Sequence, residues 1–351
     1  MSVNGAGRAA RHRPPVGRWI AVVVAAVAVV ALIVVLAGED DDPATVTRSP
    51  GAAEGPEEPT RLAFVVTGGA EPAVAMIGAG GDLAPAAFVL PPSLTMVVPG
   101  AGELEVRETA LLPLEEMRMG LSNGMGAWSQ EAARIDLDDL VAGLGDVPLT
   151  VNLPTAETLG GVAIGPGEVE LTPTQVGDLL AAASEDPDLR WDAILTALLA
   201  SPDRIPLPTE ATDAEAATTV LLGARGADPV VVPTEFVAGT LLVPAQPRLD
   251  DDVATAFGTE APVPVEVRNG SGVPGAGGAV GEAIVPIGYR VVLSGNAETF
   301  DVQRTEIVAN GVDHQPEAQA IRDALGVGTV RVSQVPSGIA DVTIVIGADL
   351  S

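Results

Sequence analysis

An uninterrupted apolar run near the start of the sequence constrains this chain more than any other feature. It extends over 20 residues from Trp19 to Gly38, reads WIAVVVAAVAVVALIVVLAG and contains no charged residue. As a helix, a run of this length spans about 30 Å, the thickness of the hydrocarbon core of a bilayer. We therefore predict a single transmembrane helix at 19–38, with Trp19 at one membrane interface.

Two other interpretations of this run are a buried helix of a soluble protein and a cleaved signal peptide. The length of the run and the position of Trp19 at its edge favour the membrane over a soluble core. A signal peptide usually has an apolar region of about 7 to 15 residues that ends in a small-residue cleavage site. This run is longer and instead passes through Val35, Leu36 and Ala37 into acidic residues, which favours an uncleaved anchor.

The charges that flank the run predict its orientation. No acidic residue precedes Glu39, whereas four arginines precede the run and four acids follow it: Arg8, Arg11, Arg13 and Arg18, then Glu39, Asp40, Asp41 and Asp42. Because basic flanks stay on the cytoplasmic side, we expect residues 1–18 to be a basic cytoplasmic segment and the bulk of the chain to be extracytoplasmic. That outer part carries 14 Arg against 47 acids, a net charge of −33.

The composition excludes several classes of function. All 18 basic residues are arginine, the formal net charge of the 351 residues is −29, and the chain has two His and no Cys. A chain without basic clusters cannot neutralise nucleic-acid phosphates, and one without cysteine has no disulfide and no thiolate metal site. We therefore predict no nucleic-acid partner, no cofactor and no metal site.

Composition also divides the outer part into segments. Residues 39–60 hold seven acids and four prolines with almost no large apolar residue, which predicts an acidic disordered linker. A second proline-rich and acidic stretch at 243–261 contains the run Asp250, Asp251, Asp252, and it predicts a linker between a domain at 61–242 and a domain at 262–351. Neither acidic run has the interleaved spacing of a calcium-binding loop, so we interpret both as solvated.

The domain at 61–242 alternates short strand patterns with capped helical patterns, which predicts a mixed α/β architecture. The expected strands lie at 61–66, 86–90, 94–98 and 149–153, and the expected helices at 136–144, 173–183, 188–199 and 213–225. Thr172 is the expected N-cap of the second of these helices.

The final segment predicts a small α/β domain. An alternating strand, PVPVEVRNG from Pro262 to Gly270, precedes a small-residue helical stretch to Ile287 and a strand at 289–293, which together form a βαβ unit. Further strands are expected at 305–309, 329–332 and 341–346. A helix is expected at 316–325, with Pro316 in its first turn and Gly326 past its end.

The loop after the first of these strands holds the one motif with a possible ligand. Residues 270–275 match G-x-G-x-x-G, and Asn269, Gly270, Ser271 and Gly272 form a possible ligand or turn motif. The domain has only about 90 residues and Pro274 lies where a nucleotide-binding helix must expose its first amides, so a tight turn is favoured over a dinucleotide site. A weakly held anion at the helix N-terminus remains open.

Two further residues are interpreted as structural. Asn269 starts a glycosylation sequon, which is discounted because the lysine-free, Ala- and Gly-rich composition is typical of a GC-rich bacterium. His314 is the only histidine of the outer part, and nothing near it resembles a nucleophile elbow, so it is predicted to cap a helix or to lie on the surface.

The C-terminal motifs resemble a known family. VPVEVRNGSGVPG, GYRVVLSGNAETFDVQRTEIVANG, EAQAIRDALGV and ADVTIVIGADL occur in the order seen in the LytR C-terminal domain, which ends many LytR-CpsA-Psr envelope proteins, especially in actinobacteria. The resemblance covers Pro262 to Leu350. It implies a binding or structural role, because no catalytic residue of that domain can be carried over.

The preceding domain looks like a degenerate LytR-CpsA-Psr catalytic domain. GAEPAVAMI and VLPPSLTMVVPGAG are similar to two family strands, and Pro92 and Ser93 stand where the family has an Arg-Asp pair. LVAGLGDVPLTV at 140–151 and LTPTQVGDLLAA at 171–182 resemble two further family motifs, the second with alanines in place of an arginine. The helix that follows keeps one base at a family position, Arg190.

These departures decide the functional hypothesis. The resemblance implies an enzyme that moves a polyprenyl-pyrophosphate-linked glycopolymer onto peptidoglycan, with arginines that bind the pyrophosphate and a carboxylate that helps to hold Mg²⁺. Pro and Ala cannot make bidentate contacts to a diphosphate. We therefore predict no catalytic residue and a membrane-anchored binding or scaffolding module of cell-wall assembly, whose partner is a wall polymer or another envelope protein. The alternatives are a residual phosphotransferase that uses Arg190, Arg107, Arg118 or Arg134, and a simple tether for a wall polymer.

Overall fold

The computed structural model of the chain describes residues 58–334 and 338–350. The predicted cytoplasmic segment, the transmembrane helix at 19–38 and nearly all of the acidic linker at 39–60 lie outside the described residues. Within the described ranges, no helix is both long and apolar enough to span a bilayer. The described residues form a mixed α/β structure, which confirms the predicted fold class for this part of the chain.

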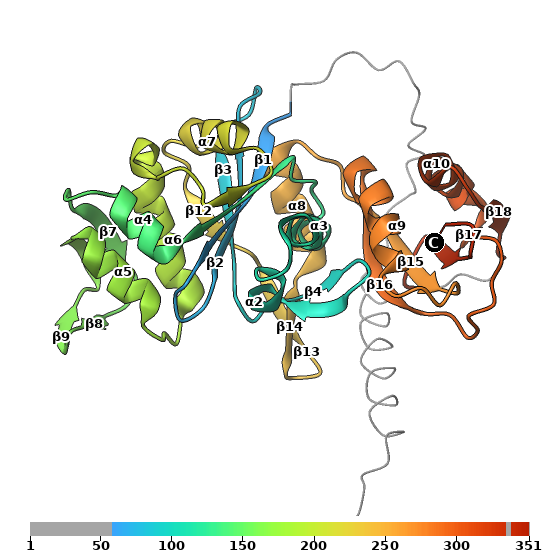
Figure 1. The fold of residues 1–351 in the computed structure, drawn as a ribbon, viewed down its shortest axis with the longest axis horizontal. Helices are drawn as coiled ribbons and strands as arrows, with labels where there is room; N and C mark the ends of the chain where they lie inside the picture. The colour runs from blue at the N-terminus through green and yellow to red at the C-terminus, as the bar shows by residue number, and fades with distance from the viewer. Residues whose placement is uncertain (1–57, 335–337, 351) are drawn as a thin grey trace, which may run out of the picture. The chain divides into compact units, whose positions relative to one another are not determined.

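A six-stranded sheet forms the centre of the first part of the chain (Figure 1). Its strand order is β11 (Glu210–Ala211), β6 (Glu131–Asp136), β1 (Thr60–Thr67), β2 (Ala73–Ala79), β3 (Ala86–Leu90) and β12 (Pro229–Val231). β1 pairs antiparallel with β2 and parallel with β6, and β12 is parallel to β3. The strands β1 and β3 were predicted from their patterns, and β2, which is buried along its whole length, was expected only from the resemblance of GAEPAVAMI to a family strand.

The central strand β1 is buried on both faces, so the sheet lies between two helical layers. Leu62 and Phe64 face one core, together with α4 (Leu137–Gly143), α5 (Pro173–Ala181), α6 (Pro187–Ala200) and α7 (Ala214–Gly223). Ala63 and Val65 face the opposite core, with α3 (Leu114–Met125) and α8 (Gln246–Phe257). The two helical layers are visible on either side of the sheet in Figure 1. This three-layer arrangement fixes the positions of α5 and α6, which carry the candidate site.

Side-chain caps set the starts of the predicted helices. The Asp136 carboxylate accepts a hydrogen bond from the amide of Asp138 at 3.0 Å, and Asp213 accepts from two amides at the start of α7. Thr172 and Gln175 form a capping box at α5, in which each side chain bonds to the backbone amide of the other. The four helices predicted in this region are confirmed to within two or three residues at their ends.

The predicted linker at 243–261 is wrong over most of its length. Residues 246–257 form α8, and Leu249, Val253 and Phe257 repeat every fourth residue along its buried side. Phe257 packs edge-on against Phe88, with 5.3 Å between the ring centroids. The proline that suggested a linker lies in the first turn of α8, where a helix tolerates it. This segment is therefore part of the core.

The other elements of this part are short. They are β4 (Thr95–Val98), β5 (Gly102–Glu105), α2 (Val106–Thr109), β7 (Leu149–Leu153), β8 (Glu157–Leu159), β9 (Val162–Ile164), β10 (Gly167–Leu171), the 3₁₀ helix η1 (Pro202–Arg204), β13 (Thr234–Val237) and β14 (Leu241–Pro244). They pair as four two-stranded sheets, β4 with β5, β7 with β10, β8 with β9 and β13 with β14. The strands β4 and β7 were predicted.

A five-stranded sheet forms the last part of the chain, as predicted. Its order is β16 (Tyr289–Asn296), β15 (Val263–Asn269), β19 (Val342–Ile346), β17 (Glu306–Ala309) and β18 (Thr329–Val332). The helices α9 (Ala276–Ile284) and α10 (Gln315–Leu325) pack on it, with short 3₁₀ helices η2 (Val285–Ile287) and η3 (Val312–His314). β15 is parallel to both β16 and β19, which confirms the βαβ unit.

The side chain of Asn123, near the end of α3, joins this sheet to the first part of the chain. Its Oδ1 accepts the amide of Val291 at 2.7 Å, and its Nδ2 donates to the Val291 carbonyl at 2.9 Å and to the Val97 carbonyl at 2.8 Å. The carboxamide thus pairs with the edge of β16 as a neighbouring peptide group would. An edge strand that is closed in this way cannot pair with another chain at that point.

Charge and close packing extend the contact around Asn123. The Arg290 guanidinium, from β16, bonds to Gln246 and to both carboxylate oxygens of Asp250, at 2.7 and 3.2 Å. A second close contact involves α9, where a Cβ added to Gly281 would lie 2.5 Å from the Cβ of Pro99. Because only glycine allows so close an approach, the β4–β5 turn rests directly on α9. Asp250, predicted to be solvated, is thus an ion-pair partner.

Candidate functional site

The structure brings together the positions at which the first domain departs from the family that it resembles. Pro92, which follows β3, Ala182, at the end of α5, and Arg190, in the first turns of α6, all line one small cavity. The loop between β1 and β2 closes a third side, because the amide of Ala70 donates to the Leu180 carbonyl at 3.0 Å. Segments that are about 100 residues apart in the sequence therefore meet at one candidate site.

Arg190 makes protein contacts with its whole guanidinium group. Its Nε and Nη2 form a two-pronged ion pair with the Glu157 carboxylate, at 2.9 and 2.8 Å. Nη1 donates to the carbonyls of Leu179 and Ala182, and Nη2 also donates to that of Ala183 at 3.5 Å. A guanidinium has five N–H donors, so each one has an acceptor within the protein. Arg190 thus holds the end of α5 onto α6 and β8 and presents no free donor to a ligand.

The cavity itself is small and has an acidic rim. Its volume is about 20 Å³, which is room for a single water molecule. Phe64 and Trp191 stack behind it, with 6.5 Å between their ring centroids, and fill the space between the sheet and α6. Glu71 and Asp188 also line the cavity, whereas the charge of Arg190 is already compensated by Glu157. In the walls of this cavity, a pyrophosphate would therefore meet carboxylates and no available guanidinium.

Arg107 is the one candidate arginine that lies at the mouth of this cavity with an accessible side chain. It belongs to α2, its amide donates to the carbonyl of Pro92 at 2.9 Å, and its side chain is 46% exposed. The guanidinium forms ion pairs with Glu105 and, at 3.5 Å, with Glu71. Exposed pairs of this kind are weak and open readily, so this guanidinium is available to an anion.

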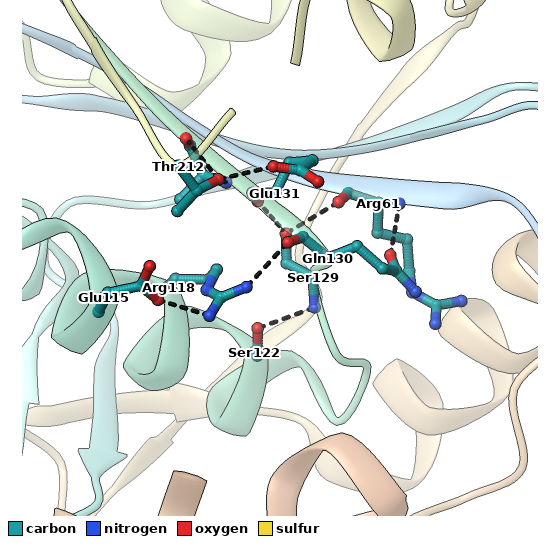
Figure 2. Close-up of polar contacts among 9 residues, drawn as sticks. Arg61, Glu115, Arg118, Ser122, Ser129, Gln130, Glu131 and Thr212 are labelled. Atoms are coloured by element: carbon teal, nitrogen blue, oxygen red, sulfur yellow. Dashed lines mark hydrogen bonds and ion pairs between the residues drawn. The ribbon is translucent and has the colours of Figure 1, made fainter. Parts of the chain in front are cut away.

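Arg118 and Arg134, the other two candidates, support the fold. Arg118 bonds to the Gln130 carbonyl at 2.8 Å and pairs with Glu115 (Figure 2). Its guanidinium also lies over the Trp128 ring, 4.5 Å from the ring centroid. The same network ties this loop to β1, because the Arg61 amide donates to the Gln130 side chain at 2.7 Å. Arg134 pairs with Glu210 and bonds to two backbone carbonyls before α3. In the contacts of the described residues, the four candidate arginines share no partner.

Asp192 lies next to Trp191 on α6, and among the described acids near the site it is the one whose pKa is strongly raised. Burial, together with the negative charges of Asp228 and Asp188, raises the pKa of Asp192 to about 6. Its Oδ1 is buried and has no hydrogen-bond partner among the described residues. This carboxyl is therefore a cost to the folded state whenever it is ionised.

Replacing Asp192 by asparagine is expected to stabilise the protein at pH 7.5. Because the folded-state pKa is raised above the value of 3.8 in the unfolded chain, the stability that the acid contributes is complete below pH 3.8 and is lost as the pH rises through about 6. After allowance for solvent screening, we expect a gain of about 1 to 2 kcal/mol at pH 7.5 and none at pH 3.5. Urea unfolding at the two pH values measures this; an equal gain at both would contradict it.

The loop of the possible ligand motif is a closed turn. The Asn269 carboxamide accepts hydrogen bonds from the amides of Ser271 and Gly272, at 3.1 and 3.2 Å, and donates to the Val273 carbonyl at 2.7 Å. Gly272 has φ +75°, which favours glycine. The first amides that a phosphate would need are thus occupied by Asn269, and the turn interpretation of 269–272 agrees with the geometry.

His314 and a metal site are the two remaining chemical possibilities that the sequence raised. His314 lies 3.5 Å from Asp341, in an ion-pair geometry at the start of α10, and this agrees with a surface position. Among residues 58–334 and 338–350, no three His, Asp or Glu side chains form a group that could hold a metal ion. Of the residues that line the cavity, only Glu71 and Asp188 carry carboxylates, so these two side chains are the ones that could contact a Mg²⁺ there.

Residues 262–350 match a protein family described as LytR cell envelope-related transcriptional attenuator. This confirms the predicted C-terminal domain and its limits. The matched residues include the five-stranded sheet, the loop of Asn269 and the β16 edge that Asn123 closes. Among proteins with curated descriptions, none matches the chain.

Several solved structures are similar to the chain. One is a LytR-Csp2A-Psr enzyme from Actinomyces oris, at 13% identity and TM-score 0.43, with 57% of this chain and 90% of that chain covered. Another is TagU of Bacillus subtilis, at 12% and 0.41, with 56% and 94% covered. A third is the LytR-CPS2A-psr family protein YwtF (TagT) with bound octaprenyl pyrophosphate lipid, at 10% and 0.45, with 60% and 95% covered. Because these sequence identities and TM-scores are low, the chemistry of the site is argued only from the side chains of this chain.

Proposed function

We propose that this chain, which carries a LytR C-terminal domain at 262–350, is a membrane-anchored extracytoplasmic envelope protein that binds a wall component and does not catalyse transfer. The observation that carries the proposal is Arg190, whose donors all have acceptors within the protein. The small volume of the cavity and the carboxylates of Glu71 and Asp188 support it. The apolar run at 19–38, long enough for a membrane anchor, and the net charge of −33 of the residues after it, which anionic headgroups would repel, support the proposed location.

A second candidate function is a residual phosphotransferase that uses Arg107. Its support is the position of this accessible guanidinium at the cavity mouth, beside Glu71. The structure of YwtF (TagT) with bound octaprenyl pyrophosphate lipid suggests a substrate of the same class for such an activity. One mobile guanidinium supplies only part of the charge that a leaving diphosphate requires.

The experiment that separates the two candidates is a transfer assay. Full-length protein in detergent is incubated with a polyprenyl-pyrophosphate-linked glycan, peptidoglycan and Mg²⁺, and both polymer transfer and release of polyprenyl phosphate are measured. We expect neither product above the level of a protein-free sample. Turnover that Arg107→Ala abolishes would establish the phosphotransferase. Arg107→Ala is the appropriate variant because the Arg107 side chain is 46% exposed and those of its partners Glu71 and Glu105 are 37% and 33% exposed, whereas Arg190 and Glu157 are both largely buried.

A further inference from the structure

A second cavity lies where the β4–β5 turn meets the C-terminal sheet. We name it the junction cleft; its walls are residues 100–102 of the turn, the loop 269–275 and residues 294–296 at the end of β16. Its volume is about 330 Å³, within the range of small-molecule sites and far above that of the cavity beside Arg190. The close packing of Pro99 and Gly100 on α9 holds the turn in place, so this cleft exists only while the two sheets are joined.

The walls of the junction cleft carry no charged side chain, although the outer part of this chain has a net charge of −33. Most of the lining residues are glycine, alanine or proline, which leave backbone amides and carbonyls open to close approach. Ser294 and Asn296 add a hydroxyl and a carboxamide. A charged ligand would find no partner in such walls, whereas an uncharged ligand rich in hydroxyl and amide groups would find many hydrogen-bonding positions.

The polar side chains of the cleft differ in their availability. The Asn269 carboxamide is used within its own loop, where it keeps the wall of the cleft rigid. In the part of the chain that the structure describes, the side chains of Ser294 and Asn296 make no hydrogen bond to protein. Both residues lie in β16 after Val291, the residue whose backbone Asn123 bonds. They are the donors and acceptors that a ligand can use.

An exposed aromatic ring lies next to the same loop. Phe300 is 56% exposed, and its Cβ would lie 3.1 Å from a Cβ added to Gly272 of the loop. The ring of Phe300 is open to solvent beside an uncharged cleft, so its face can take a stacking partner. A ligand longer than the cleft can cross the loop and lay an apolar ring face on Phe300.

From this arrangement we propose that the junction cleft and Phe300 bind an uncharged polysaccharide segment. Hydroxyl and amide groups of the sugars bond to Ser294, Asn296 and the backbone of the β4–β5 turn, and one ring face stacks on Phe300. The site rests on the proposed function as a wall-binding module and gives that module its substrate class. It also explains why the C-terminal domain is joined to the first part of the chain, since residues 100–102 supply one wall.

The test uses full-length protein in detergent and the hexamer of β-1,4-linked N-acetylglucosamine as the probe, with binding measured by titration calorimetry. We expect saturable binding that weakens about tenfold in Phe300→Ser, which removes the stacking ring. Ala101→Trp, which fills the cleft from an exposed turn position, is expected to abolish binding. The matched controls are Phe236→Ser, at the other strongly exposed phenylalanine, and Ala163→Trp, at an exposed strand position; both should bind as the wild type does.

The outcomes separate the cleft from the proposed function. Absence of binding to the hexamer, or binding that Phe300→Ser and Ala101→Trp leave unchanged, overturns the cleft assignment. Preferred binding of a galacturonic acid hexamer, an anionic probe, overturns it as well. Cosedimentation with peptidoglycan sacculi tests the wall-binding function separately: if the wild type and both variants sediment equally, that function stands and the site lies elsewhere.

Discussion

Glu157→Ala is expected to lower the free energy of unfolding by about 3 to 5 kcal/mol, because it leaves the Arg190 guanidinium buried without its ion-pair partner. The two side chains are only 5% and 11% exposed, and their contact is two-pronged, at 2.9 and 2.8 Å. The backbone carbonyls that Arg190 also contacts cannot replace a full negative charge. Urea denaturation followed by circular dichroism measures the loss.

Two further variants make this result specific. Glu306→Ala removes the partner of Arg331 in an exposed pair, whose side chains are 45% and 65% exposed, and should leave the unfolding curve close to that of the wild type. The double variant Glu157→Leu with Arg190→Met replaces the pair by apolar side chains and should recover most of the lost stability. If Glu157→Ala unfolded like the wild type, Arg190 would not depend on Glu157 and would be free to bind a ligand.

Asn123→Leu is expected to cost about 3 to 4 kcal/mol and to separate the unfolding of the two sheets. Leucine is close to asparagine in size but leaves the amide and carbonyl of Val291 and the carbonyl of Val97 without their partner. Each buried polar group that loses its hydrogen bond costs about 1 to 3 kcal/mol. Scanning calorimetry of the wild type should show one transition for the described part of the chain, and that of the variant two.

The control for this prediction is Asn152→Leu. Asn152 lies on an exposed face of β7, so the same change there should leave the calorimetric profile unaltered. A single transition in Asn123→Leu, at the wild-type temperature, would show that the C-terminal sheet is not held by this contact. The junction cleft would then lose the structural basis for its first wall.

The elements that the sequence predicted well are those whose ends carry local signals. Asp136, Thr172 and Asp213 cap helices with side chains that act within three residues, and the Pro316 and Gly326 pair brackets α10. Such signals depend on the immediate neighbours of a residue and not on the tertiary fold. The C-terminal sheet was predicted for the same reason, because its strands alternate and its turns contain glycine.

The missed elements are those whose sequence is explained only by their neighbours. α3 contains Gly120 and Gly124, and an added Cβ would meet Val98 at 2.9 Å in the first case and the Met96 side chain closer still in the second. Residues that look unsuited to a helix are thus required for its packing. In α8 the repeat of Leu249, Val253 and Phe257 was present in the sequence, but prolines and three consecutive aspartates obscured it.

The candidate site was predicted in its positions and not in its contacts. The resemblance singled out Pro92 and Ser93, the alanines at the end of 171–182 and Arg190, and of these Pro92, Ala182 and Arg190 line one cavity. The partner that decides the role of Arg190 is Glu157, which lies 33 residues earlier on the short strand β8. No local pattern joins the two residues, so the sequence could not show that this arginine is fully occupied.

The most direct test of the central claim, that the cavity beside Arg190 cannot hold a pyrophosphate, is equilibrium binding of octaprenyl pyrophosphate to the full-length protein. The measurement is ³¹P NMR titration in detergent with Mg²⁺, with Arg107→Ala as the matched variant. The donors of Arg190 already have acceptors within the protein, and Glu71 and Asp188 add negative charge to the cavity. We therefore expect no saturable change in the diphosphate resonances of the wild type. Saturable binding that Arg107→Ala removes would contradict the account.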